Sequence, residues 1–150
     1  MRNMSEKISI IIPCYNESER LDVEAFKRFE DQLHFLFVND GSSDNTAEII
    51  KRELGGKNCD ILDLRLNCGK GEAIRRGYLY LKTLPVYEEL SWVGYWDADL
   101  ATPLSELNYF FSPENPPSPP FPKGGKGGFS LFFVSPCDMN VSYYSYYYIY

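Results

Sequence analysis

The chain has 150 residues, of which 44% are hydrophobic, and its formal net charge is −6. This length is typical of one domain, and this hydrophobic content is enough to bury a core. The acidic balance argues against a nucleic-acid partner, because nucleic acids are normally bound by a basic surface.

Strands and helices are predicted to alternate over residues 1–111. The apolar run at residues 8–12 predicts a buried strand that ends at Pro13, and the spacing of apolar residues over 21–33 predicts a helix. The remaining predicted elements are strands at 35–38, 61–66 and 92–96, helices at 46–54 and 72–81, and a last helix that opens at Thr102-Pro103. The predicted N-caps are Asn16 for the first helix, Ser43 or Asp44 for the helix at 46–54, and Thr102 for the last, with Pro103 at its first position.

This order of elements predicts an α/β fold with a mostly parallel sheet and helices on both faces. Ligands of such sheets bind beyond the carboxyl ends of the strands. The residues that directly follow each predicted strand are therefore the candidates for a functional site.

The first two predicted strands are followed by polar segments. Tyr15, in Pro13-Cys14-Tyr15-Asn16-Glu17, is able to stack on a flat base, although a plain strand-to-helix turn needs no more than these residues. Asp40 can accept a hydrogen bond from a pyrimidine imide or a ribose hydroxyl, and Gly41 lets the backbone turn close to a ligand. The alternative for the second segment is a capped turn made of the commonest turn residues.

The third predicted strand is followed by Asn67-Cys68-Gly69-Lys70-Gly71, directly before a helix. Glycines at this position expose backbone N–H groups and Lys70 adds a cation, so the segment can cradle a phosphate. It lacks the spacing of a Walker A loop and that of the dinucleotide-binding glycine motif.

The fourth predicted strand is followed by Asp97-Ala98-Asp99. Two carboxylates at this spacing can hold a diphosphate through a divalent cation, with one binding the metal and the other a sugar or ribose. Oxygen ligands suit Mg²⁺ or Mn²⁺, and phosphate oxygens would complete the coordination. A D-x-D tripeptide is common by chance, so the indication comes from its position after a buried strand.

Together, four segments resemble the family 2 glycosyltransferases, which have a GT-A fold, and among them the dolichyl-phosphate sugar synthases. They are I-I-I-P-C-Y-N-E, F-V-N-D-G-S-S-D-N-T, N-C-G-K-G and Y-W-D-A-D-L. The resemblance covers residues 7–111. It implies an inverting, metal-dependent transfer of a sugar from a UDP- or GDP-sugar to an acceptor, with a polyprenyl phosphate as one candidate.

The resemblance also implies a role for each matching residue. The nucleoside pocket would be lined by Pro13, Tyr15 and Glu17, the base would be bound by Asp40 beside Gly41, and the nucleotide would lie against Gly69 and Lys70. Asp97, with Ala98 beside it, would contact the ribose or sugar, and Asp99 would bind the Mg²⁺ or Mn²⁺ ion. Asp97, Asp99 and Lys70 would form the catalytic group, because the metal and Lys70 offset the charge that builds on the leaving diphosphate.

The composition changes near residue 112. Residues 112–150 hold seven of the ten prolines and a tyrosine-rich end, but only two acids, Glu114 and Asp138. Members of the family continue after the D-x-D with elements that build the acceptor site. We expect the tail to be non-native sequence after a truncation, and the alternatives are a flexible linker or a membrane or partner contact. On the truncation hypothesis the chain is a non-catalytic fragment that binds a nucleotide.

Cysteine spacing and hydrophobicity make two further predictions. The four cysteines include no C-x-x-C pair and there is a single His34, so reduced thiols are expected rather than a zinc site. No apolar stretch reaches the length of a spanning helix, so we expect a cytoplasmic protein without a transmembrane segment, either free or at the cytoplasmic face of a membrane. The weakest rival is another Rossmann-like domain such as a methyltransferase, which would need a glycine motif after the first strand.

Overall fold

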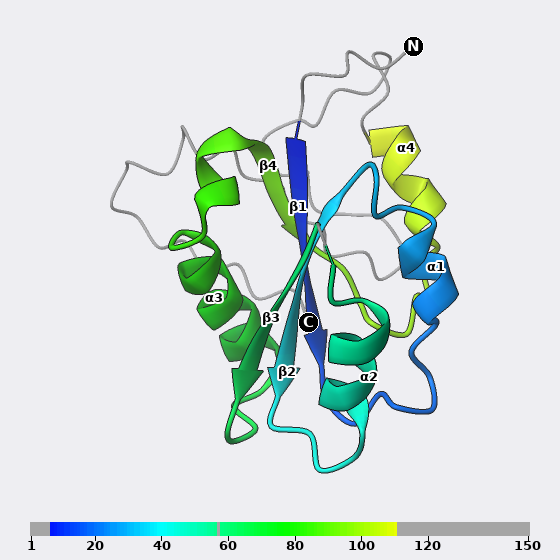
Figure 1. Ribbon diagram of the computed structural model, residues 1–150, viewed down its shortest axis with the longest axis vertical. Coiled ribbons are helices and arrows are strands. Elements are labelled where there is room, and N and C mark those ends of the chain that lie inside the picture. The colour runs from blue at the N-terminus through cyan, green and yellow to red at the C-terminus, as the bar shows by residue number, and fades with distance from the viewer. Residues whose placement is uncertain (1–6, 57, 111–150) are drawn as a thin grey trace, which may run out of the picture.

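The computed structural model describes residues 7–56 and 58–110, which contain one four-stranded sheet (Figure 1). The strands are β1 (Lys7–Cys14), β2 (His34–Asp40), β3 (Cys59–Leu64) and β4 (Leu90–Tyr95). Their order is β3-β2-β1-β4, and all neighbouring pairs run parallel. The predicted α/β class with a parallel sheet is confirmed. The predictions for residues 112–150 lie outside the described residues.

Helices cover both faces of this sheet, as predicted (Figure 1). The helices are α1 (Val23–Lys27), α2 (Thr46–Glu53), α3 (Lys70–Leu81) and α4 (Leu107–Phe110), with 3-10 helices η1 (Pro85–Glu89) and η2 (Leu104–Glu106). One face carries α3, and the opposite face carries α1, α2 and α4. Within the described part of the chain, no helix is long and apolar enough to span a bilayer.

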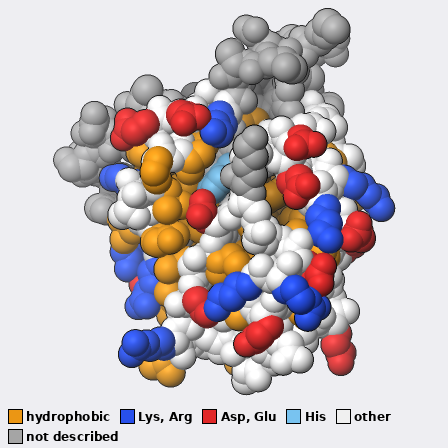
Figure 2. Space-filling view, viewed as in Figure 1, with side chains coloured by type: hydrophobic (Ala, Val, Ile, Leu, Met, Phe, Trp, Pro, Cys, Tyr) orange, Lys and Arg blue, Asp and Glu red, His pale blue; other side chains and the backbone are white. Residues whose placement is uncertain are grey.

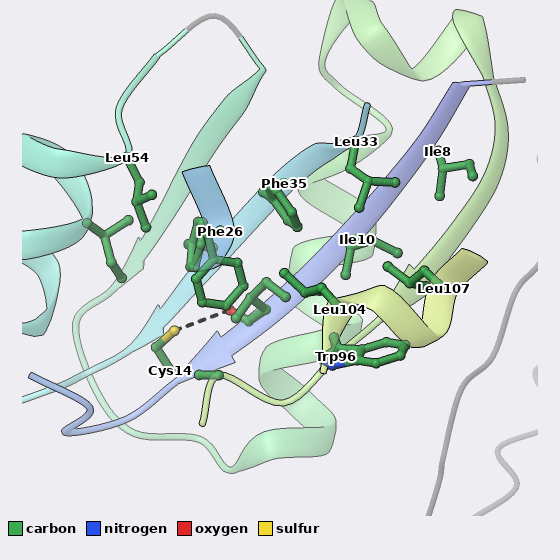
Figure 3. Close-up of a cluster of buried hydrophobic side chains, with 14 residues drawn as sticks. Ile8, Ile10, Cys14, Phe26, Leu33, Phe35, Leu54, Trp96, Leu104 and Leu107 are labelled. Atoms are coloured by element: carbon green, nitrogen blue, oxygen red, sulfur yellow. Dashed lines mark hydrogen bonds between the residues drawn. The ribbon is translucent and has the colours of Figure 1, made fainter. Parts of the chain in front are cut away.

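The larger core lies on the face covered by α1, α2 and α4 (Figure 3). Phe26 of α1 is completely buried, and its ring meets Phe35 and Phe37 of β2 edge-on, with centroids 5.4 and 5.1 Å away. Edge-to-face pairs of this kind are favoured because the positive ring edge meets the negative ring face. Short as it is, α1 is therefore anchored to the sheet by one aromatic side chain.

The second core packs α3 against the other face of the sheet. Gly77 lies where the helix crosses the strands, and a Cβ there would be only 2.7 Å from Val38 Cγ2 and 3.0 Å from Ile11 Cγ2. The missing side chain lets helix and sheet approach closely. The beginning of α3 at Lys70 is thereby held near the carboxyl ends of β1 and β2.

Several predicted boundaries differ from the structure: the strands predicted at 61–66 and 92–96 are Cys59–Leu64 and Leu90–Tyr95. Two further boundaries are wrong for identifiable reasons. The helix predicted over 21–33 is helical only at Val23–Lys27 and continues as successive turns, in which Leu33 donates its N–H to Phe29. The same apolar spacing suits a helix or a chain of tight turns. Strand β1 does not end at Pro13, which pairs with Val38 of β2. Its pairing with β4 ends at Ile11, so the absent proline N–H interrupts no pairing on that side.

The predicted helix caps also differ from the structure. Asp22, not Asn16, caps α1 by accepting the Ala25 N–H. Asn45 precedes α2 and its side chain makes no capping bond, while Pro103 rather than Thr102 precedes η2. Asn16 instead accepts the N–H of Ser43, whereas Asp44, one of the two caps predicted for α2, does accept the N–H of Thr46, the first residue of that helix.

A chain of polar side chains, buried at Ser9 and His34 and partly exposed at Asp60, crosses three strands at the amino end of the sheet. His34 Nδ1 lies 2.7 Å from Ser9 Oγ and His34 Nε2 lies 3.0 Å from Asp60 Oδ2. Since the carboxylate accepts from Nε2, the hydroxyl of Ser9 donates to Nδ1. The arrangement has the connectivity of a Ser-His-Asp triad, but Ser9 is 0% exposed and no substrate could reach it. It is a structural element of the sheet.

His34 should make the stability of the protein depend on pH. Burial lowers the pKa of His34, and its hydrogen bond to Asp60 only partly opposes this, while Lys7 adds to it. The unfolded chain therefore binds the proton first, so the stabilisation is complete above about pH 6.5 and declines as the pH falls below that value. Urea unfolding from pH 7.5 to 5.5 should show a loss, at most about 1.4 kcal/mol per pH unit, that is absent from His34→Gln. Parallel curves for the two proteins would contradict this.

Candidate donor-binding site

A cleft of about 370 Å³ lies at the carboxyl ends of β1, β2 and β4, where the alternating fold places ligands. Its lining residues come from the carboxyl ends of β1 and β2, from the turns that follow β1 and β4, and from the segment that leads into α3. They are Pro13, Cys14, Tyr15, Glu17, Asp40, Asn67, Lys70, Asp97, Ala98 and Asp99.

Every site residue that was predicted from the sequence lines this cleft, except Gly41 and Gly69. Gly69 precedes α3 and Gly41 lies beneath the segment that leads into it, against the backbone of Leu66 and Asn67. Both glycines shape the cleft without lining it. Cys14 and Asn67 were missed, although both occur within the segments that carry the resemblance.

The turn that presents Asp97 and Asp99 is fixed from both sides by Trp96. Its backbone N–H donates to Ile11 of β1, and its indole N–H donates to the Thr102 carbonyl at 2.7 Å. Within the turn, Asp99 Oδ1 accepts the N–H of Ala101 at 3.1 Å. Trp96 is buried in the larger core, so the two exposed carboxylates stand on a rigid support.

Leu100, next to Asp99, has a backbone conformation that side-chain-bearing residues rarely adopt, with φ of +50°. Its N–H donates to the Asp97 carbonyl, which closes the tight turn. Backbone strain of this kind persists where surrounding contacts hold it and often accompanies function.

Lys70 is the lysine of the cleft, and it forms an ion pair with Asp97 across it. Its ammonium also lies 5.7 Å from the centre of the Tyr95 ring. Both members of the pair are about half exposed, at 54% and 50%, so the pair adds little to stability and either side chain is free to meet a ligand.

Asp40 has a structural task besides lining the cleft. It is only 2% exposed, and its Oδ1 accepts the N–H of Cys68 at 2.8 Å while its Oδ2 accepts the N–H of Gly69 at 2.9 Å. The Cys68 thiol also donates to Oδ1. Asp40 therefore holds the segment that brings Lys70 to the cleft. Its predicted contact with a base stays a prediction.

The cleft is acidic. It contains four carboxylates, those of Glu17, Asp40, Asp97 and Asp99, against the ammonium of Lys70. Burial raises the pKa of Glu17, Asp99 acts in the same direction, and the nearby Arg20 opposes both. On the face seen in Figure 2, by contrast, acidic and basic side chains are interspersed. The concentration of negative charge in the cleft favours binding of a cation.

The cleft residues fit a divalent cation that is coordinated partly by the protein and partly by a phosphorylated ligand. Asp97 and Asp99 provide exposed carboxylate oxygens of the kind that Mg²⁺ and Mn²⁺ prefer. Over residues 7–56 and 58–110, no three acids, histidines or cysteines converge closely enough to hold a metal by themselves. An ion here would need oxygen ligands from a diphosphate.

Comparison with known proteins identifies the class of the chain. The sequence model of "Glycosyl transferase family 2" matches residues 9–111. The chain belongs to this glycosyltransferase family, and its described part has the parallel α/β architecture of a GT-A fold.

Among its relatives are two poly-β-1,6-N-acetyl-D-glucosamine synthases. The protein of Staphylococcus aureus (strain COL) is 38% identical over 77 residues, and that of Staphylococcus epidermidis is 39% identical over 75 residues. Each match covers 48% of this chain and 18% of the relative, so the chain spans about a fifth of their length.

Two solved structures share the fold. The mannosyltransferase PcManGT of Pyrobaculum calidifontis, in complex with GDP-Man and Mn²⁺, superposes with a TM-score of 0.53 at 18% identity, over 75% of this chain and 35% of that one. S. aureus TarS superposes with a TM-score of 0.50 at 21% identity, over 62% and 16%. At these identities the likeness supports the architecture alone.

Proposed function

We propose that residues 1–111 form the donor-binding part of an inverting, metal-dependent glycosyltransferase that takes a sugar from a UDP- or GDP-sugar. The observation that carries this proposal is that Tyr15, Lys70, Asp97 and Asp99 line the same cleft, in a chain of glycosyl transferase family 2. The aromatic face suits a nucleotide base, the cation suits a diphosphate, and the two carboxylates suit the metal ion that a sugar nucleotide carries.

The residues of the cleft have separable roles in this proposal. Tyr15, 48% exposed, stacks on the base, and Pro13 and Glu17 complete the nucleoside end. The Lys70 ammonium moves from Asp97 to the diphosphate and neutralises part of its charge. Asp97 can then accept a hydrogen bond from a hydroxyl of the ribose or sugar. Preorganised charges of this kind lower the barrier because they are already in place when the leaving group becomes anionic.

Asp99 would hold the Mg²⁺ or Mn²⁺ ion, with Asp97 beside it. When bound, the ion would neutralise the diphosphate and stabilise it as a leaving group. Supporting this, PcManGT, which shares the fold, was solved with GDP-Man and Mn²⁺.

The acceptor class is proposed from the resemblance to dolichyl-phosphate sugar synthases: a polyprenyl phosphate. Its oxygen is already anionic, so its attack on the sugar would need no strong base from the protein. Binding such a lipid would place the protein at the cytoplasmic face of a membrane. Inversion would be tested by the anomeric configuration of the product.

The experiment that tests the donor site is thermal unfolding of the full chain with UDP or GDP, each with and without Mn²⁺. A nucleotide at 100 times its dissociation constant adds about 2.7 kcal/mol, which for a domain of this size raises Tm by roughly 10 °C or more. We expect the larger shift with Mn²⁺ and with only one of the two nucleotides. No shift under any condition would refute a formed donor site.

Asp99→Asn should remove the metal-dependent part of that shift. The substitution keeps the shape of the side chain and its bond to the Ala101 N–H, but removes the charge that attracts the ion. Asp31→Asn, at an exposed turn outside the cleft, is the matched control and should behave as the wild type. A full Mn²⁺ effect in Asp99→Asn would contradict the metal role.

The second candidate is a fragment that binds a nucleotide without catalysing transfer, with residues 112–150 as a separate tail. It is favoured by the family match, which stops at residue 111, and by the scarcity of acids after it, namely Glu114 and Asp138. Sugar transfer from UDP- or GDP-sugar to a polyprenyl phosphate by the purified chain would exclude it. A nucleotide-dependent rise in Tm without any transfer would support it.

A further inference from the structure

The turns that follow β1 and β2 are joined side chain to backbone. Asn16 donates its backbone N–H to Ser42 Oγ at 3.0 Å, and its Oδ1 accepts the N–H of Ser43 at 2.9 Å. The Ser43 hydroxyl also donates to Oδ1, at 3.4 Å. Asn16 has φ of +52°, a conformation that asparagine tolerates better than most residues. It therefore connects the two turns in both directions.

Asp44 makes the second connection. Its Oδ2 accepts the N–H of Ser18 at 3.1 Å, and its Oδ1 accepts the N–H of Thr46 at 3.0 Å and the Thr46 hydroxyl at 2.5 Å. Thr46 Oγ1 in turn accepts the N–H of Glu17 at 2.8 Å. Burial opposes ionisation of Asp44, but these hydrogen bonds outweigh it and hold the pKa of the carboxyl well below its ordinary value. Asp44 is therefore a charged acceptor, which strengthens its bonds.

These contacts fix a stretch of backbone that carries two cleft residues. Tyr15 and Glu17 line the cleft on either side of Asn16, whereas no residue of 42–46 lines it. The backbone of residues 16–18 donates three N–H groups to side chains of the second turn. The direction in which Tyr15 and Glu17 point is thus set from outside the cleft. Neither Asn16 nor Asp44 needs to touch a ligand to affect it.

We propose that Asn16 and Asp44 are positioning residues that hold the nucleoside end of the donor site in its binding shape. The inference rests on the proposed donor site and deepens it. On this proposal the polar residues after β2 support the binding site, whereas the alternative from sequence was a capped turn without a role in binding. Preorganisation of this kind raises affinity because the free protein has less to order when the ligand binds.

Two variants test the inference at a temperature where each is folded. Asn16→Gly tolerates the positive φ but removes the Oδ1 acceptor, and Asp44→Asn keeps the side-chain shape but replaces one acceptor oxygen by a donor. Each should raise the Kd for the nucleotide that the wild type prefers by about tenfold, measured by titration calorimetry. The fold increase in Kd of the double variant should be smaller than the product of the two single-variant increases, because both residues act on the same connection between the turns. Amide exchange at Glu17, Ser18 and Ser43 should speed up in the ligand-free variants.

The control is Asp22→Ala, which removes the cap of α1 at the same end of the sheet and should lower Tm without changing Kd. Unchanged Kd values in Asn16→Gly and Asp44→Asn, with a wild type that binds, would overturn this inference and leave the donor site standing. No nucleotide binding by the wild type would overturn the donor site and the positioning role together.

Discussion

Gly41→Ala should lower the free energy of unfolding by about 2–5 kcal/mol and weaken nucleotide binding in the same protein. Gly41 has φ of +68°, and a Cβ there would lie 2.4 Å from the backbone nitrogen of Asn67 and 2.5 Å from the carbonyl carbon of Leu66. Backbone atoms cannot rotate away as a flexible side chain can. The whole segment that leads to Lys70 would have to move, and its hydrogen bonds to Asp40 would be lost.

Gly69→Ala is the matched control, because it carries the same kind of strained backbone without the overlap. Gly69 has φ of +90°, and nothing lies within 4 Å of an added Cβ. Its loss should be limited to backbone strain, about 1–3 kcal/mol. Urea unfolding and nucleotide titration of both variants give the comparison. Equal losses in the two proteins would show that close packing under Gly41 is unimportant.

Phe26→Ala should cost about 3–5 kcal/mol of unfolding free energy, the usual range for truncating a buried phenylalanine. Phe26 is the only buried residue of α1 and meets both Phe35 and Phe37. Its removal leaves a cavity against β2 and frees α1 from the sheet. Urea unfolding followed by circular dichroism measures the loss.

The control for Phe26→Ala is Leu79→Ala, an apolar side chain of α3 that is 40% exposed. It should change stability by no more than about 0.5 kcal/mol. A loss below about 1 kcal/mol for Phe26→Ala would mean that α1 is held by other contacts or that the core closes over the cavity.

The alternation of strands and helices was predictable because its signals are local. The apolar run at 35–38 and the helical stripe at 72–81 lie within β2 and α3, and β2 extends beyond both predicted ends while α3 extends only at its start. The ends could not be located from sequence because strand pairing decides where a strand stops, and Pro13 shows it: it belongs to β1 through its pairing with Val38. The helix predicted over 21–33 was wrong because tight turns and a helix bury the same apolar positions.

The convergence of the site was predictable for a different reason. A parallel sheet brings the carboxyl ends of its strands to one edge, so residues following several strands must meet there. For this reason Tyr15, Lys70 and Asp97 line one cleft, although Tyr15 and Lys70 are 55 positions apart in the sequence. Their roles toward a ligand remain predictions.

The alternation of elements, the parallel sheet and the edge at which the polar residues gather follow from the amino-acid sequence alone, because each depends on spacing along the chain. The contacts of those residues depend instead on how the folded elements pack against one another. Asp40 proved to hold the Cys68 and Gly69 amides, and Asp44 to reach the Ser18 amide as well as its own helix. Such partners are 26 to 29 residues apart along the chain. Which of them come within hydrogen-bonding distance is set by the packing of neighbouring strands, and no local pattern records it.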